Sequence, residues 1–228
     1  MMMLNPTSYL KSGYTNSNGI ISSGSQQLYA QMGSYYNGTT GCQPTNITVN
    51  TSFNCTRVDF TQTGLKNDMT RNAIEEVVWN LGGSSTYSNV ITKTFYSSER
   101  GNVAYSGHAT KWLGKVGMIY PSDYGYATSG GTTGRSACLT KELYNWNASG
   151  FTDCENNNYL FKSGKWYWTL TSNNELASSV FRVGPTGFVG RYRAQVAGGT
   201  YPTVYLKTDI SVGMGDGSQQ NPYQLEIK

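Results

Sequence analysis

The sequence predicts an α+β fold, in which two helices pack against an antiparallel sheet in the C-terminal third of the chain. Two helical patterns, over residues 68–81 and 136–146, support the helical part. Beyond residue 165, short runs of β-branched and aromatic residues alternate with Gly, Pro and Asn, which is typical of strands and turns. We expect one domain, in which residues 1–62 form irregular strands and loops and residues 63–228 form the core.

The first helical pattern places an apolar residue at every fourth position, which indicates one buried helix face. These positions are Met69, Ala73, Val77 and Leu81, with Ile74 and Val78 beside them. Asp68 is suited to cap the N-terminus, and Gly82 can adopt the left-handed conformation that ends a helix. The pattern therefore predicts a core helix from Asp68 to Leu81. Its expected buried residues are Ile74, Val77, Val78 and Leu81.

A second, shorter helix is predicted from Ser136 to Trp146. Its expected inward residues are Ala137, Leu139, Leu143 and Trp146. Between the two helices, residues 112–126 combine β-branched residues with Gly and Pro, which predicts a strand that leads into an aromatic loop.

The C-terminal third predicts a β-meander. Its expected strands cover residues 166–171, 179–183, 188–193, 203–206 and 223–227, with a turn at 184–187. Ladder hydrogen bonds fix the backbone of such a sheet, so its outward side chains can change without unfolding the domain. Outward residues of this sheet are therefore good candidates for a binding surface.

Four cysteines form two local couples, Cys42 with Cys55 and Cys138 with Cys154. Each couple brackets a loop rich in Gly, Asn and Thr, and closing such a loop removes roughly 3 kcal/mol of unfolded-chain entropy. Zinc binding is the alternative, but the sequence has no Cys-x-x-Cys motif and a single histidine, His108. We expect two disulfides and therefore an oxidising, extracellular compartment.

The composition also suits an extracellular protein. Charged residues make up 13% of the chain, against about 25% in an average soluble protein. The net charge of +4 is not gathered into any run of Lys or Arg, which argues against nucleic acid as a partner. No apolar run approaches the ~20 residues of a membrane span, so no membrane insertion is expected. Residues 1–6 are too short for a signal sequence, so a secreted form would have lost its signal or anchor.

Several ordered motifs lie in the last two thirds of the chain. They are Trp-Asn-Leu-Gly-Gly at 79–83, the stretch 114–127, Trp-Tyr-Trp-Thr-Leu-Thr at 166–171, Val-Phe-Arg-Val at 180–183, and the tail segments 202–207 and 215–225. Together these motifs resemble a family of bacterial, mostly Gram-positive, surface and pilin-like proteins. The resemblance covers roughly residues 65–228. It implies the formylglycine-generating-enzyme branch of the C-type lectin fold, which the variable proteins of diversity-generating retroelements also use.

One departure from this family concerns a strand near the end of the chain. Relatives carry Arg-Pro-Val where this sequence has Tyr201-Pro202-Thr203. If that arginine pairs with a buried carboxylate in the relatives, the pair is missing here.

The sequence offers few groups for catalysis. The formylglycine-generating relatives use a reactive cysteine pair, whereas the cysteines here are better placed to close loops. His108 lacks the Gly-x-Ser-x-Gly motif that accompanies a hydrolase triad. Asp123 and Asp153 are not spaced onto one element, and Asp123 is better explained as the cap of a turn. We therefore expect a protein that is not an enzyme and needs no cofactor.

Calcium and glycosylation are two further alternatives. Asp209, Asp216 and Asn221 could supply oxygen ligands to Ca²⁺, although Gly215-Asp216-Gly217 more simply predicts a tight turn. We therefore assign no metal site. The Asn-x-Ser/Thr sequons lie at Asn37, Asn46, Asn50, Asn54 and Asn147, and a composition this rich in Asn, Ser and Thr produces such triplets without selection.

These observations predict an extracellular module on the bacterial surface that binds a ligand or mediates adhesion. Aromatic and Arg side chains ringed by amides are typical of recognition surfaces, and they gather in the C-terminal sheet. The expected binding residues are Trp168, Asn173, Asn174, Arg182, Arg191 and Tyr192. The partner would be a protein or a glycan. The alternative is a structural subunit of a filament or pilus, which would mainly contact copies of itself.

Overall fold

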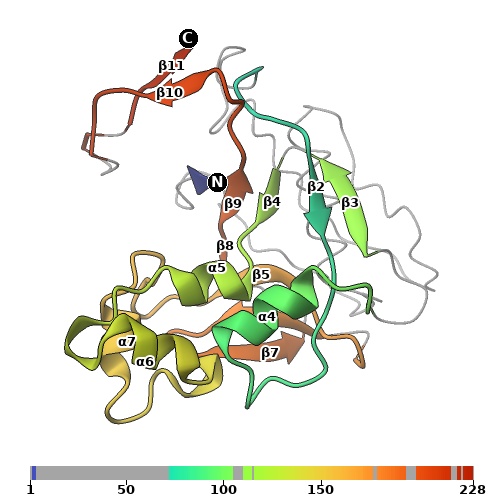
Figure 1. Cartoon of the computed structure of the whole chain (residues 1–228), viewed down its shortest axis with the longest axis vertical. Coiled ribbons are helices and arrows are strands. Elements are labelled where there is room, and N and C mark those ends of the chain that lie inside the picture. Colours follow the sequence, from blue (N-terminus) through green and yellow to red (C-terminus); the bar gives the residue numbers. More distant parts are fainter. Residues whose placement is uncertain are drawn as a thin grey trace.

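The computed structural model describes residues 2–3, 72–104, 110–114, 116–176, 179–193, 199–216, 220–221 and 223–227. Figure 1 shows short helices gathered on one side of a sheet, smaller sheets beside this body, and a C-terminal hairpin at the far end. The chain is therefore α+β, as predicted. The predicted N-terminal segment 1–62 lies outside the described residues, apart from Met2–Met3.

The described part of the chain contains four α-helices and two short 3-10 helices. They are α4 (Thr92–Glu99), α5 (Pro121–Tyr126), η2 (Gly131–Thr133), α6 (Arg135–Thr140), η3 (Leu143–Asn145) and α7 (Thr152–Asn156). The strands of the first two thirds are β1 (Met2–Met3), β2 (Val77–Asn80), β3 (Lys111–Gly114) and β4 (Val116–Met118). The strands of the last third are β5 (Tyr167–Ser172), β6 (Ser179–Val183), β7 (Val189–Arg193), β8 (Gly199–Thr200), β9 (Pro202–Val204), β10 (Ile210–Val212) and β11 (Leu225–Ile227).

The largest sheet has the strand order β7-β6-β5-β8. Strands β5, β6 and β7 are antiparallel neighbours, so the predicted meander is confirmed for these three. The prediction is wrong beyond them, because β8 runs parallel to β5 and β9 pairs with β1 and β4 in a separate sheet. Strands β10 and β11 pair with each other as a hairpin.

The predicted core helix from Asp68 to Leu81 is wrong from residue 73 onward, although Ile74 and Leu81 are buried as predicted. Residues 77–80 form β2, which pairs with β3 so that Trp79 lies opposite Trp112. Val78 is 55% exposed and Val77 is half-buried, whereas both were predicted to be buried in the core. β-Branched residues suit a strand, and here pairing with a distant segment overrides a local pattern that also fits a helix.

Gly82 has a different role from the predicted helix end. A Cβ atom on this residue would lie 2.1 Å from the carbonyl oxygen of Ser98, so no larger side chain fits there. Its amide donates a hydrogen bond of 3.0 Å to the carbonyl oxygen of Glu99. The chain therefore passes directly against the end of α4, which helps to hold that helix in place.

Helix α4 was not predicted, because its inner face is not uniformly apolar. The buried residues of this helix are Thr92, Phe95 and Glu99. Because a threonine and a glutamate occupy two of the buried positions, the apolar residues alone do not show the helical period. The predicted aromatic loop likewise contains a helix, since α5 begins at Pro121, a favoured first residue of a helix.

The predicted helix 136–146 is split in two. Helix α6 ends at Thr140, Lys141 is extended (φ −84°, ψ 141°), and η3 follows. Leu143 and Trp146 are buried as predicted, whereas Ala137 is exposed and Leu139 is half-buried. Cys138 occupies the inner face of α6 instead, where it forms the predicted disulfide with Cys154 of α7.

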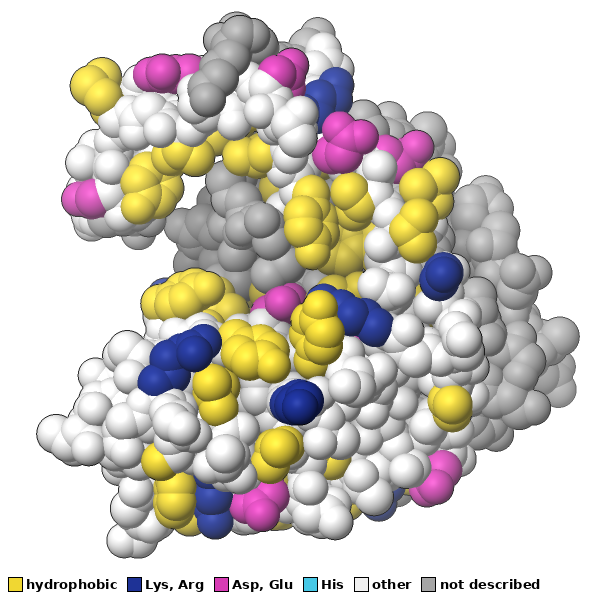
Figure 2. Space-filling model, viewed as in Figure 1, with side chains coloured by type: hydrophobic (Ala, Val, Ile, Leu, Met, Phe, Trp, Pro, Cys, Tyr) yellow, Lys and Arg dark blue, Asp and Glu magenta, His cyan; other side chains and the backbone are white. Residues whose placement is uncertain are grey.

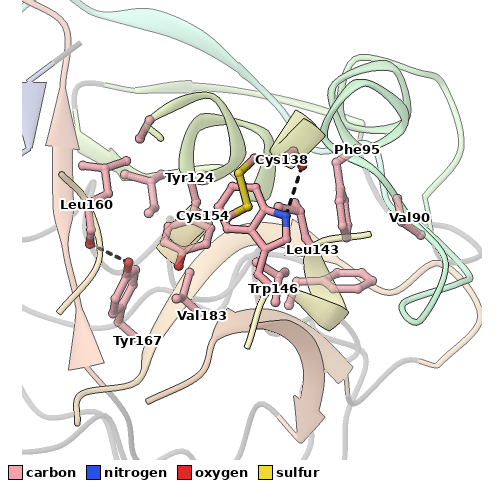
Figure 3. Packing of buried hydrophobic residues seen from close by; sticks show 14 of the residues in the cluster. Val90, Phe95, Tyr124, Cys138, Leu143, Trp146, Cys154, Leu160, Tyr167 and Val183 are labelled. Atoms are coloured by element: carbon pink, nitrogen blue, oxygen red, sulfur yellow. Dashed lines mark hydrogen bonds between the residues drawn. A yellow bond between two sulfur atoms is a disulfide. The ribbon is translucent and has the colours of Figure 1, made fainter. Parts of the chain in front are cut away.

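The core lies between the helices and the four-stranded sheet. Figure 3 shows the Cys138–Cys154 disulfide packed beside the Trp146 and Tyr124 rings, whose centroids are 5.5 Å apart. The indole N–H of Trp146 donates to the carbonyl oxygen of Cys138 at 3.2 Å, which ties the indole to the disulfide. The predicted Cys42–Cys55 disulfide lies outside the described residues.

Among the described residues, no helix has the length and apolar character needed to cross a membrane.

Candidate functional site

The pleat of the four-stranded sheet divides the predicted binding residues between two faces. Trp168 lies opposite Arg182, and Val180 lies opposite Tyr192, so these residues share one face. We call this the distal face, because the opposite face carries Tyr167, Phe181 and Val183 of the core.

Arg191 lies on the other face of the sheet. It pairs with Phe181 across the ladder, and its guanidinium carbon lies 4.6 Å from the centre of the Tyr87 ring. The prediction that Arg191 shares a surface with Arg182 and Tyr192 is therefore wrong. Sequence reasoning placed both arginines in one patch because it did not apply the alternation of the strand.

Two further predicted residues are buried. Trp168 is 0% exposed and Asn173 is 1% exposed, so neither presents its side chain to solvent. The Asn173 amide donates to the carbonyl oxygen of Ser85, and its oxygen accepts hydrogen bonds from the amides of Glu175 and Leu176. Asn173 therefore builds the turn that follows β5, and Asn174 beside it is half-buried.

Arg182 is the centre of the distal face. Its guanidinium carbon lies 3.9 Å from the centre of the Tyr192 ring and 4.7 Å from that of Trp166. Tyr192 is 42% exposed, whereas Arg182 and Trp166 are partly exposed. The Trp166 ring also contacts Trp168 edge-on, with centroids 5.2 Å apart. Trp166 was not predicted as a site residue, although its position two residues before Trp168 places it on the same face.

The charge of Arg182 has no counter-ion among the described residues, as is also true of Arg191 on the opposite face. No carboxylate of the described residues forms an ion pair with Arg182, and its Nε atom is buried without a hydrogen-bond partner. Removal from water lowers the pKa of the guanidinium, and the Tyr192 hydroxyl acts in the opposite direction. The aromatic rings supply cation–π attraction in place of a counter-ion.

A second surface lies where α4 meets α5. The guanidinium carbon of Arg100 lies 3.6 Å from the centre of the Tyr96 ring, and Tyr96 and Tyr126 contact each other edge-on. Figure 2 shows hydrophobic and basic side chains gathered on this side of the molecule, around a hollow beneath the C-terminal hairpin. Sequence reasoning missed this surface because α4 itself was missed.

Beneath this surface lies the buried carboxyl group of Glu99. It accepts hydrogen bonds from the amide and the hydroxyl of Ser122, and Arg100 lies 3.2 Å away. Burial raises the pKa of Glu99 to about 7, although the Ser122 hydrogen bonds act in the opposite direction. Glu99 thus joins the end of α4 to the start of α5. All of its polar contacts are made within the protein, so it is a structural residue.

The two aspartates considered for catalysis lie on different helices, Asp123 on α5 and Asp153 on α7. Asp123 was predicted to cap a turn, and it instead caps the N-terminus of α5, where it accepts a hydrogen bond of 2.9 Å from the amide of Tyr120. Asp153 lies on α7 and accepts hydrogen bonds from Thr132 and Thr133, which lower its pKa. His108 lies outside the described residues. In the described part of the chain, no group of three or more His, Cys, Asp or Glu side chains could hold a metal ion.

Comparison with protein-family models finds no match, and comparisons with curated proteins and with solved structures find none either.

Proposed function

We propose that this protein is an extracellular module of the bacterial surface that binds a ligand or mediates adhesion, without catalysis and without a cofactor. The finer fold proposed with it is the C-type-lectin-like fold that the sequence motifs resemble. The observation that carries the proposal is the partly exposed cluster of Trp166, Arg182 and Tyr192 on the distal face. Aromatic and Arg anchors on a rigid sheet are the residues that dominate binding energy at protein surfaces.

The rigidity of this cluster supports a recognition role. Arg182 belongs to β6, which is hydrogen-bonded to a strand on each side. Two rings contact its guanidinium, which limits the rotamers open to it, so less side-chain entropy is lost when a ligand binds. A flexible surface arginine would lack this advantage.

The experiment is a screen of the full chain against glycans and cell-surface proteins, followed by substitution on both faces of the sheet. Tyr192→Ala and Trp166→Ala should weaken binding of the ligand that the screen returns by tenfold or more, since hot-spot truncations cost about 2 kcal/mol or more. Arg191→Ala is the matched control, because this residue lies on the opposite face of the same sheet. Unchanged binding in both distal-face variants would contradict the proposal.

The hairpin formed by β10 and β11 supports a second candidate, the subunit of a surface filament. Val212, Met214 and Tyr223 of this hairpin are 53%, 72% and 52% exposed. A two-stranded hairpin is at best marginally stable alone in water, so contact with a second copy would stabilise it. Light scattering across a range of concentrations distinguishes the candidates. A constant monomer mass favours the ligand-binding module. A mass that increases with concentration in the wild type but not in Met214→Asp favours the filament.

A further inference from the structure

The hairpin of β10 and β11 leaves apolar side chains exposed. Val212 lies opposite Leu225 across the ladder, so the two share one face of the hairpin. Val212, Met214 and Tyr223 are each more than half exposed. Because a two-stranded hairpin is at best marginally stable alone in water, a second surface that covers these side chains would stabilise it.

The hairpin is also acidic. In the described ranges 208–216, 220–221 and 223–227, the charged residues are Asp209, Asp216 and Glu226, and all three are exposed. Lys207 precedes the hairpin and is half-buried. A surface that complements this hairpin would therefore combine apolar or aromatic side chains with positive charge.

The same chain carries such a surface where α4 meets α5. Tyr96 is 44% exposed and Tyr126 is 39% exposed, and their rings contact each other edge-on with centroids 6.2 Å apart. The guanidinium of Arg100 lies over the Tyr96 ring, and that of Arg135 donates to the carbonyl oxygen of Tyr126. Lys93 lies one helical turn before Tyr96 and is exposed. We call these five residues the basic aromatic surface.

The exposed charges of this surface are positive. Glu99 is fully buried and paired with Arg100, and Asp123 is half-buried. Lys93 and Arg135 are exposed, and neither forms an ion pair with a carboxylate of the described residues. The basic aromatic surface thus complements the hairpin both in charge and in apolar character.

Within one copy the two surfaces stay apart. The amide of Glu75 donates to the carbonyl oxygen of Tyr205 at 2.8 Å, and the amide of Lys207 donates to that of Ala73 at 2.9 Å. The Tyr205 ring also packs against Trp79, with centroids 5.3 Å apart. These contacts fix the chain just before the hairpin, and Figure 2 shows a hollow beneath the hairpin on the side of the basic aromatic surface. Each surface is therefore open to a second copy.

We infer that the hairpin of one copy docks on the basic aromatic surface of a second copy. The exposed apolar side chains of the hairpin would cover the Tyr96 and Tyr126 rings, and a thioether such as that of Met214 contacts aromatic rings favourably. The hairpin carboxylates would lie near Lys93 and Arg135. The inference rests on the second candidate function, the surface filament, which it deepens by naming the two surfaces that meet. Because these surfaces differ, the contact is heterologous and repeats from copy to copy.

The first measurement is the mass of the full chain by light scattering at increasing protein concentration. We expect the mass of the wild type to rise, and to rise less at high salt, because the contact pairs opposite charges near solvent. Met214→Asp on the hairpin and Tyr96→Asp on the basic aromatic surface should each weaken the association tenfold or more. Lys93→Glu is a second variant of the same surface that decides if Tyr96→Asp fails to fold.

Two control variants make the same chemical changes elsewhere. Leu176 and Lys165 are exposed and belong to neither surface. Leu176→Asp and Lys165→Glu should therefore associate like the wild type. Equal losses in the controls and in the surface variants would show a general effect of added negative charge and would overturn the contact.

Mixing the two defective variants is the decisive step. Met214→Asp keeps an intact basic aromatic surface, and Tyr96→Asp keeps an intact hairpin. Each variant alone should remain a monomer at a concentration where the wild type associates, whereas an equimolar mixture should form one junction and reach twice the monomer mass. A mixture that stays monomeric would overturn the contact.

The outcome is separable from that of the candidate function on which it rests. If Met214→Asp abolishes association but Tyr96→Asp and Lys93→Glu associate like the wild type, the filament stands and the proposed contact is overturned. A wild type that remains a monomer at every concentration would overturn both, and would leave the ligand-binding module untouched.

Discussion

Two regions of this protein bury a charged group in different ways. At the α4–α5 contact, the Glu99 carboxyl group accepts hydrogen bonds from Ser122 and lies beside Arg100. On the distal face, Arg182 has two aromatic rings beside it, no paired carboxylate among the described residues and a buried Nε without a partner. A buried charge whose contacts are complete is satisfied within the fold, whereas a buried donor without a partner destabilises the fold and needs another explanation, for which we propose ligand binding. Substitutions in the two regions should therefore differ in what they change: stability and its pH dependence in the first region, and ligand binding in the second.

The largest expected effect comes from the core that supports the first region. Trp146 is fully buried and donates to the Cys138 carbonyl oxygen, so Trp146→Ala removes a large packed ring and one buried hydrogen bond. We expect the free energy of unfolding to fall by about 3–5 kcal/mol, measured by urea denaturation. Tyr159→Ala is the control, since Tyr159 is 74% exposed and its removal should change stability little. Equal effects of the two substitutions would contradict the described core.

The next effect concerns the disulfide. The double substitution Cys138→Ala and Cys154→Ala opens a loop with a sequence separation of 16, which should lower the free energy of unfolding by about 3 kcal/mol. Urea denaturation of this variant against the wild type measures the loss. Chemical reduction is a poorer test, because it would also act on Cys42 and Cys55. A variant as stable as the wild type would show that the crosslink does not support the helices.

The third effect is a pH dependence at Glu99. Its pKa of about 7 lies above the ordinary value of 4.5, so the folded state binds the proton more tightly than the unfolded state. The resulting stabilisation is complete below pH 4.5 and is lost as the pH rises through 7. A shift of this size corresponds to roughly 3 kcal/mol. Glu99→Gln imitates the protonated group, so this variant should be more stable than the wild type at pH 8 and similar to it at pH 4.

The difference between the two proteins isolates Glu99 from its titrating neighbours. Burial also raises the pKa of Asp123, and Arg100 acts on both carboxyl groups, but these residues are common to the variant and the wild type. Parallel stability curves for the two proteins between pH 4 and pH 8 would contradict the buried position of this carboxyl group.

The sequence predicted strands better than helices in this protein. The expected strand at 179–183 coincides with β6, because a short run of β-branched and aromatic residues that ends at Gly184-Pro185 is typical of a strand. Part of the segment expected to form a helix at 68–81 forms the strand β2 instead, and its partner β3 lies more than thirty residues away in the chain. A local pattern carries no information about such a partner.

Only part of the candidate site could be predicted from the sequence, because the rest depends on contacts between distant segments. Arg182 and Tyr192 were identified from residue type, and the strand alternation could have added Trp166 and excluded Arg191. No sequence signal could show that Asn173 completes a turn with Ser85, because that contact joins segments 88 residues apart. The absence of a partner for Arg182 is likewise a property of the folded chain alone.

The most direct test of the comparison is the unfolding free energy of Arg182→Met beside that of the wild type, measured in urea without ligand. If Arg182 is held open for a ligand, its replacement by an uncharged side chain of similar length removes an unpaired buried donor. The variant should then be as stable as the wild type or more stable, by up to about 1 kcal/mol. A loss of more than about 2 kcal/mol would instead make Arg182 a structural residue, and would contradict the role of the distal face as a surface held open for a ligand.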